Sequence, residues 1–196
     1  NRAVTQSDYQ SMIYRMPPKF GAIKRTAVLR DEDSFKRNLN VYVISEDSDG
    51  YLSKTNDSIK SNLKTWLQSN KMVNDTIDIL DAKVANFGVN FRVIADLESP
   101  KFDVLARAET QLKEYFSRKM DIGEPIFLTD IYSELKKVDG LIDVVSVKII
   151  KKVGGLYSDV NFDLEGGQSP DGRYIEVPKN VILELKYPDS DIMGVI

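Results

Sequence analysis

NFGVNFRVIAD, residues 86–96, alternates apolar and polar side chains, and this period of two is typical of a half-buried strand. The apolar side carries Val89, Phe91, Val93 and Ala95, and the other side carries Asn90, Arg92 and Asp96. None of these residues belongs to a recognisable active-site motif. The alternating pattern therefore predicts a sheet strand with one face toward a core.

Two helices and a second strand are predicted after this strand. Pro100 begins a helix whose apolar positions recur every three or four residues, at Leu105, Ala108, Leu112, Tyr115 and Phe116. A second helix, capped by Thr129 or Asp130, carries Ile131, Leu135 and Val138 on one stripe. LIDVVSVKII, residues 141–150, alternates again and places Val145, Val147 and Ile149 on one face.

The amino-terminal part of the chain predicts a second sheet-and-helix layer. Thr5 and Asp8 have the spacing of a capping box, and Pro17-Pro18 ends the helix that begins there. Strands are predicted at 20–29, 39–44 and 77–84. A helix from about residue 55 carries Ile59, Leu63, Trp66 and Leu67 on one face. We expect Trp66 and Phe116 to be buried on their helices.

The carboxy-terminal residues predict short strands at 157–164, 174–177 and 181–187, separated by glycine-rich turns. Val181, Leu183, Leu185 and Tyr187 alternate there with Ile182, Glu184 and Lys186. The predicted fold class is α+β, with two small sheet-and-helix layers and a carboxy-terminal antiparallel β-ribbon. The corresponding parts are residues 1–85, 86–150 and 151–196.

The composition limits the chemistry that the chain can perform. The 196 residues are 42% hydrophobic, which supports a real core, and they include no cysteine and no histidine. Disulfides and thiolate metal sites are therefore excluded, and the commonest general base near neutral pH is missing. No apolar run approaches the length that spans a bilayer, so we expect no membrane partner.

Two groups of acidic residues could in principle hold a cation. Ser45, Asp47, Asp49 and Gly50 partly imitate a calcium loop, but the twelfth position is Asn56 where the motif needs a bidentate Glu. Asp159, Asp163 and Glu165 could form a carboxylate cluster, although one face of a solvent-exposed strand would look the same. We therefore predict no catalytic residue, no metal and no cofactor.

Charge suggests how the chain contacts its partners. Residues 1–40 have a net charge of +4 and the remainder has −7. A basic amino-terminal third on an acidic body favours head-to-tail contacts or an acidic neighbour. The overall charge of −3 argues against nucleic-acid binding. An assembly module is thus favoured, and a carboxylate-based hydrolase or a binding module of unknown ligand is the alternative.

Four stretches carry a resemblance to a known family. They are RAVTQSDYQSMIYRMPPKFGAIKRTAV at 2–28, LNVYVISEDSDGYLSKTNDSIKSNLKTWLQSNKMVNDTIDILDA at 39–82, the segment VNFRVIAD to DVVSV at 89–147, and VPKNVILELKYPDSDIMG at 177–194. In these residues the chain resembles the J-like family of phage baseplate proteins, and within it the wedge subunits of T-even-type contractile-tailed phages. None of the four is an active-site motif.

The resemblance implies a structural role in the tail baseplate of a virion, assembled in the host cytoplasm. Such proteins form the inner ring, contact neighbouring copies of themselves and bind other wedge proteins. The chain would be the carboxy-terminal part of a larger subunit, because larger family members carry an extensive amino-terminal region.

Self-association, as a homodimer for this part alone, is the contact that we expect. It would use the strand edge at Val181, Leu183, Glu184, Leu185 and Tyr187, or the basic segment with Arg25 and Arg37.

Overall fold

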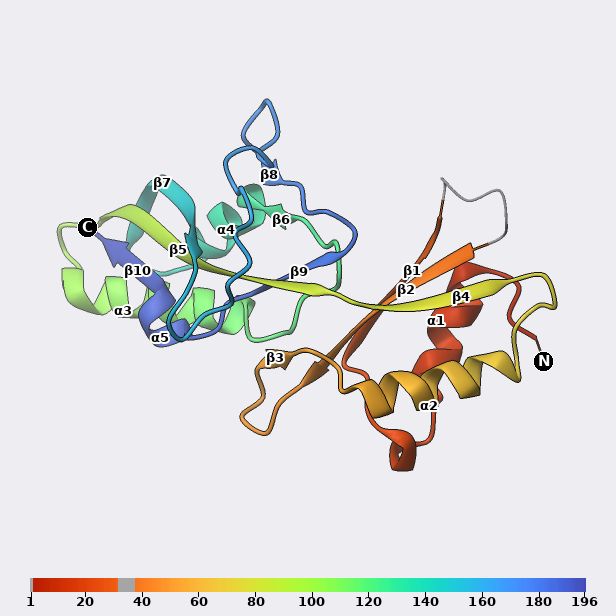
Figure 1. Cartoon of the computed structure of the whole chain (residues 1–196). Helices are drawn as coiled ribbons and strands as arrows, with labels where there is room; N and C mark the ends of the chain where they lie inside the picture. The colour runs from red at the N-terminus through yellow and green to blue at the C-terminus, as the bar shows by residue number, and fades with distance from the viewer. Residues whose placement is uncertain (1, 32–37) are drawn as a thin grey trace. The chain divides into compact units, whose positions relative to one another are not determined.

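The computed structural model describes residues 2–31 and 38–196 (Figure 1). The chain has an α+β fold and divides into two compact units. The first unit contains residues 1–83 with 179–181, and the second contains 84–178 with 182–196. Residues 151–196, predicted as a separate extension, thus contribute to both units.

The first helix begins at the predicted capping box. In front of α1 (Gln6–Tyr14), the Asp8 N–H donates to Thr5 Oγ1 at 3.2 Å, and the Thr5 N–H donates to the Asp8 carboxylate at 2.8 Å. These exchanged bonds satisfy backbone donors that a helix start leaves free. The helix ends before Pro17, and the 3-10 turn η1 (Pro18–Phe20) follows, so both predicted ends are confirmed.

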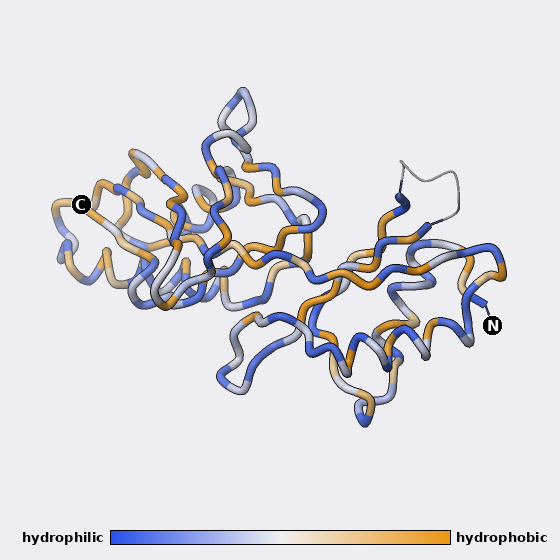
Figure 2. Tube along the Cα trace, in the orientation of Figure 1, coloured by the Kyte–Doolittle hydropathy of each residue, from blue (hydrophilic) through white to orange (hydrophobic). Residues whose placement is uncertain are grey.

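The sheet of the first unit is built around β2 (Asn38–Glu46). It pairs antiparallel with β1 (Arg25–Arg30) and β3 (Leu52–Ser53), and parallel with β4 (Thr76–Asp81). Helix α2 (Asp57–Gln68) is capped by Asn56, whose side chain accepts the Ser58 N–H at 2.8 Å. Figure 2 shows apolar and polar residues alternating along this helix. The core between helices and sheet contains Tyr9, Ile13, Val28, Val41, Val43, Leu63 and Leu67.

Trp66 and Phe116 are only half-buried, so the expectation that both are buried is wrong in degree. The Trp66 indole N–H donates to the Met12 carbonyl of α1 at 2.9 Å, so the ring lies against α1. Phe116 lies at the end of its helix and meets Phe87 edge to face, with ring centroids 5.6 Å apart.

The second unit is built around β5 (Lys83–Ala95), which contains the predicted strand. It pairs antiparallel with β7 (Leu141–Lys152), parallel with β10 (Ile192–Val195), and also with β9 (Val181–Glu184). Its predicted apolar side is confirmed, because Val89, Phe91, Val93 and Ala95 are all buried.

A β-bulge in β7 corrects the predicted face of that strand. Arg92 pairs with Ser146 and Val93 pairs with Val144, so Val145 has no partner on β5. The extra residue shifts the alternation by one position. Val144 and Val147 are consequently buried, whereas Val145, predicted on the same face as Val147, is 51% exposed.

Helices α3 (Lys101–Tyr115) and α4 (Leu128–Leu135) cover one face of this sheet. Helix α3 packs against β10, α4 packs against β7, and the two helices contact each other. Ile131, Leu135 and Val138 are buried as predicted. The N-cap of α4 is Phe127, without a side-chain hydrogen bond, so the predicted capping by Thr129 or Asp130 is wrong.

The carboxy-terminal segment does not form the predicted antiparallel ribbon. Residues 157–164 have no strand pairing, and β8 (Tyr174–Ile175) pairs with β6 (Ile126–Phe127). Strand β9 ends at Glu184, and the short helix α5 (Pro188–Asp191) leads into the parallel strand β10. The strands of this segment thus pair with different partners: β8 pairs with β6, whereas β9 and β10 pair with β5.

No helix in the ranges 2–31 and 38–196 is both long and apolar enough to cross a membrane.

Candidate functional site

The predicted calcium loop is a hydrogen-bonded turn. Asp47 Oδ1 accepts the N–H groups of Asp49 and Tyr51 at 3.0 and 2.8 Å, so this carboxylate organises the turn itself. Ser45 is buried, and its hydroxyl is 3.0 Å from the Thr55 hydroxyl. The loop therefore joins β2 to β3 through contacts within the chain.

The second acidic group is dispersed along an exposed loop. Asp163 Oδ1 accepts the Gly166 N–H at 3.1 Å, and Asp159 and Glu165 are exposed. Within the described ranges, no three Asp, Glu, His or Cys side chains lie together in a way that could hold a metal ion.

The predicted contact residues lie in different environments. Val181, Leu183 and Glu184 are buried in β9, and Leu185 and Tyr187 are half-buried. Arg25 is half-buried at the start of β1, where its guanidinium donates to the Lys24 carbonyl at 2.9 Å. Arg37 lies outside the described residues. The structure thus packs most of the 181–187 residues inside the chain, and it places Arg25 at the start of a strand of the first unit.

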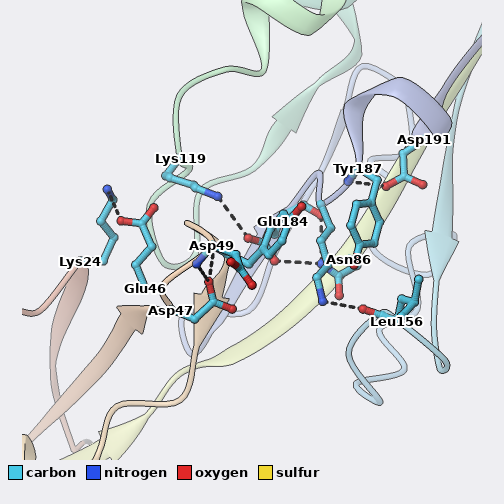
Figure 3. A network of polar contacts seen from close by, with 12 residues as sticks. Lys24, Glu46, Asp47, Asp49, Asn86, Lys119, Leu156, Glu184, Tyr187 and Asp191 are labelled. Carbon is cyan, nitrogen blue, oxygen red and sulfur yellow. Dashed lines mark hydrogen bonds and ion pairs between the residues drawn. The ribbon is translucent and has the colours of Figure 1, made fainter.

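Glu184 is the centre of a buried polar cluster (Figure 3). Its carboxylate accepts the side-chain amide of Asn86 at 3.1 Å and lies 3.2 Å from the Lys119 ammonium. The Asn86 amide oxygen in turn accepts the Ser158 N–H at 2.7 Å. A buried carboxylate needs such partners, because an unpaired charge away from water is costly. The cluster therefore joins β9 to β5 and to the 117–120 segment.

Asp191 forms a second cluster and is completely buried. Its carboxylate accepts the Tyr157 hydroxyl at 2.6 Å and the Tyr187 N–H at 3.0 Å, and it pairs with the Lys152 ammonium at 3.3 Å. The bond to Asp191 raises the pKa of Tyr157 above its ordinary value, and burial raises it further. Gly88 makes room for this cluster, since a Cβ there would lie 2.7 Å from the Asp191 carbonyl.

These two carboxylates stabilise the fold. Each is fully engaged by donors from the same unit, and both fix the segment 182–196 to the strands beneath it. Sequence reasoning selected Glu184 as a strand-edge residue but did not select Asp191. A single acidic residue within PDSDIMGV gives no periodic signal, so the pattern could not have identified it.

The apolar residues on the face of the second sheet opposite α3 and α4 were also not predicted. Arg92, Ile94, Lys148, Met193 and Val195 lie on it and are exposed. Two signals were available: the polar side of residues 86–96 and the apolar residues of IMGV at 192–195. Their proximity depends on the parallel pairing of β10 with β5, which the sequence pattern does not indicate.

Comparisons with known proteins identify the fold. No protein-family model matches the sequence, and no curated protein matches it. A solved structure shares the fold. It is a chain in the six-fold symmetrised cryo-EM structure of the anti-feeding prophage (AFP) baseplate, with a TM-score of 0.58 and 13% sequence identity. The match covers 94% of this chain and 38% of that chain, so this chain spans well under half of its neighbour's length.

Proposed function

We propose that this protein is a structural component of a contractile phage tail baseplate. The observation that carries the proposal is the similarity to the AFP baseplate chain, because it extends over 94% of this chain and includes both units. The resemblance of the sequence to baseplate wedge subunits points in the same direction. The protein would then be located in the virion tail, within the wedge or inner ring.

The work of such a component is to hold copies and partners in a fixed geometry. Its mechanism is burial of side chains at interfaces, which needs no reaction centre and no cofactor. The described acidic residues fit this role, since Asp47, Glu184 and Asp191 are engaged within the chain. We therefore propose a non-enzymatic protein that associates with itself and with other baseplate proteins.

Self-association through 181–187 is restricted by the burial of those residues. Val181, Leu183 and Glu184 are at most 5% exposed, so a contact through them would first have to separate β9 from its neighbours. Substituting Pro at Glu184 would also break the Asn86 and Lys119 contacts, so that variant would test folding rather than association.

The proposal is tested by deleting the coding sequence from the genome that carries it. Electron microscopy of the resulting particles should show tails without complete baseplates, and the gene supplied in trans should restore them. A matched control is the same gene encoding Lys64→Glu, which changes an exposed α2 residue and should restore assembly like the natural gene. Complete contractile tails in the deletion strain would refute the proposal.

A further inference from the structure

We propose that a second copy of this chain docks on the uncovered sheet face of the second unit, through a self-complementary contact. The proposal rests on the self-association in the proposed function and names its surface. We call the exposed sheet residues Arg92, Ile94, Lys148, Met193 and Val195 the open face. We call Leu97 and Phe102, with the flanking Glu98 and Asp103, the apolar knob.

The open face is assembled by strand register. Met193 of β10 lies beside Asn90 of β5, which lies opposite Lys148 of β7. The next row contains Val195, Arg92 and Ser146. Neighbours across strands point to the same side of a sheet, and this side is opposite the buried Phe91 and Val147.

The apolar part of the open face is unusual for a surface without a partner. Ile94, Met193 and Val195 are 48%, 49% and 55% exposed. Contiguous exposed apolar residues with a polar rim are typical of interaction sites. Helices α3 and α4 cover the other side. On this side the 157–158 segment and Asp191 cover the end of the sheet at Asn86 and Gly88, and the open face is the part beyond them.

A hollow of about 420 Å³ on the open face holds an unsatisfied acceptor. The residues that line it include Asn90, Arg92, Ser146, Lys148, Met193 and Val195. The Asn90 side-chain oxygen is buried and has no hydrogen-bond donor among the described residues. A buried acceptor without a donor is costly, and Asn90 can present it to a donor of a docked molecule only by rotating its side chain.

The apolar knob is the most exposed apolar feature of the described chain. Leu97 and Phe102 are 92% and 87% exposed. The turn that carries Leu97 is nevertheless held in place, because the Asp96 N–H donates to the Gly140 carbonyl at 2.8 Å and the Glu98 N–H donates to Asp96 Oδ1 at 3.3 Å. A fixed turn that presents large apolar side chains loses little conformational entropy when it binds.

Charge complementarity identifies the occupant as a second copy. The cations of the open face, Arg92 and Lys148, have no ion-pair partner among the described residues. The knob carries carboxylates at Glu98 and Asp103, which are exposed. The open face also carries the Asp143 carboxylate, which lies opposite Ile94 and pairs with Lys136 at 3.9 Å, and the knob also carries the exposed Lys101. The two cations outnumber the one carboxylate on the open face, and the two carboxylates outnumber the one cation on the knob, so the net charges of the two surfaces are opposite in sign.

The positions of the two surfaces favour a two-fold contact. The knob directly follows β5, and the open face includes Ile94, the second-last residue of that strand. Because the surfaces adjoin, two copies related by a two-fold axis can place each knob on the other's open face. A two-fold contact of this kind is closed, since each copy gives and receives the same interaction.

Strand addition at β10 is the main alternative, and its edge is partly occupied. The Gly194 N–H donates to the Glu109 carboxylate at 3.4 Å, and the Ile192 N–H donates to the Pro188 carbonyl. Backbone donors on this edge are therefore used within the chain. This leaves side-chain packing on the open face as the mode of contact.

Paired charge reversals test the proposal on the full chain. The face variant is Arg92→Glu with Lys148→Glu, and the knob variant is Glu98→Lys with Asp103→Lys. Mass is measured by light scattering between about 10 µM and about 1 mM. The natural chain should dimerise, and each variant alone should associate at least roughly 100-fold more weakly, because like charges then oppose each other at both contacts. An equimolar mixture of the two variants should recover the dimer, since opposite charges meet again at both contacts.

The control is Lys64→Glu with Lys83→Glu, an equal charge change on exposed residues of the first unit, which should leave the dimer intact. A natural dimer that both variants retain would overturn the proposed surface and leave self-association standing. Loss of the dimer in both variants without recovery in the mixture would also overturn it. A natural chain that stays monomeric overturns the proposal and self-association together, whereas the baseplate role is decided separately by the deletion experiment.

Discussion

Replacing Asp191 with Ala should destabilise the second unit by about 3–5 kcal/mol, the usual cost of removing one partner from a buried ion pair. The carboxylate is 0% exposed and engages three donors. The Tyr187 N–H would be left without its acceptor, at a cost of about 1–3 kcal/mol. The Tyr157 hydroxyl would lose a charge-assisted bond worth a similar amount. The Lys152 side chain is 22% exposed and recovers part of its hydration, so its contribution is smaller.

Urea denaturation followed by far-UV circular dichroism measures this change. With a slope of about 2 kcal/mol per molar urea, the transition of the second unit should move down by roughly 2 M. Fluorescence of Trp66, the single tryptophan, reports on the first unit and should shift less.

Asp189→Ala is the matched control, because Asp189 lies in the same helix and its side chain is 95% exposed beside Lys113. We expect no measurable change for it, as for most surface ion pairs. Equal shifts for the two variants would show that burial of the Asp191 carboxylate does not hold the 182–196 segment in place.

Three further measurements test other parts of the structure. The hydrogen bond to Asp191, and next burial, raise the pKa of Tyr157 above its ordinary value of 10.0. The free energy of unfolding that Tyr157→Phe removes should therefore be constant below about pH 10 and decrease progressively as the pH rises above it. Urea midpoints of both proteins from pH 7 to pH 11 check this, and a constant difference would contradict it. Gly194→Val should cost about 1–3 kcal/mol in thermal or urea unfolding, since a Cβ there would lie 2.5 Å from Leu105 Cδ1 of α3. Trp66→Ala should cost about 2 kcal/mol and Leu67→Ala more, because Leu67 is 0% exposed and Trp66 is half-buried; the reverse order in urea unfolding would show that the packing of α2 is misassigned.

The sequence correctly predicted the helix ends and the strand that are determined by residues close together in the chain. Thr5 and Asp8 fix a helix start through bonds three residues apart, and Pro17 ends that helix through its own ring. The alternation of 89–95 predicted the central strand, because one side of it faces the helices. The buried side chains of this strand could therefore be chosen from spacing alone.

Predictions failed where a distant partner decides the structure. Val145 breaks the alternation of β7 only because Arg92 and Val93 on β5 pair with residues on either side of it. All four residues of β9 are buried, so no alternation of exposure distinguishes its two sides. The parallel pairing of β10 is a long-range contact, and the open face depends on it.

The return of residues 179–181 to the first unit has a consequence for synthesis on the ribosome. The Asn180 carbonyl accepts the Lys83 N–H at 2.9 Å, so this contact cannot form until almost a hundred further residues have been translated. The second unit, in turn, requires 182–196. Neither unit can finish folding before the carboxy-terminal residues that it contains have been translated, and long-range closure of this kind slows folding. Truncation before residue 179 would therefore leave both units unfinished.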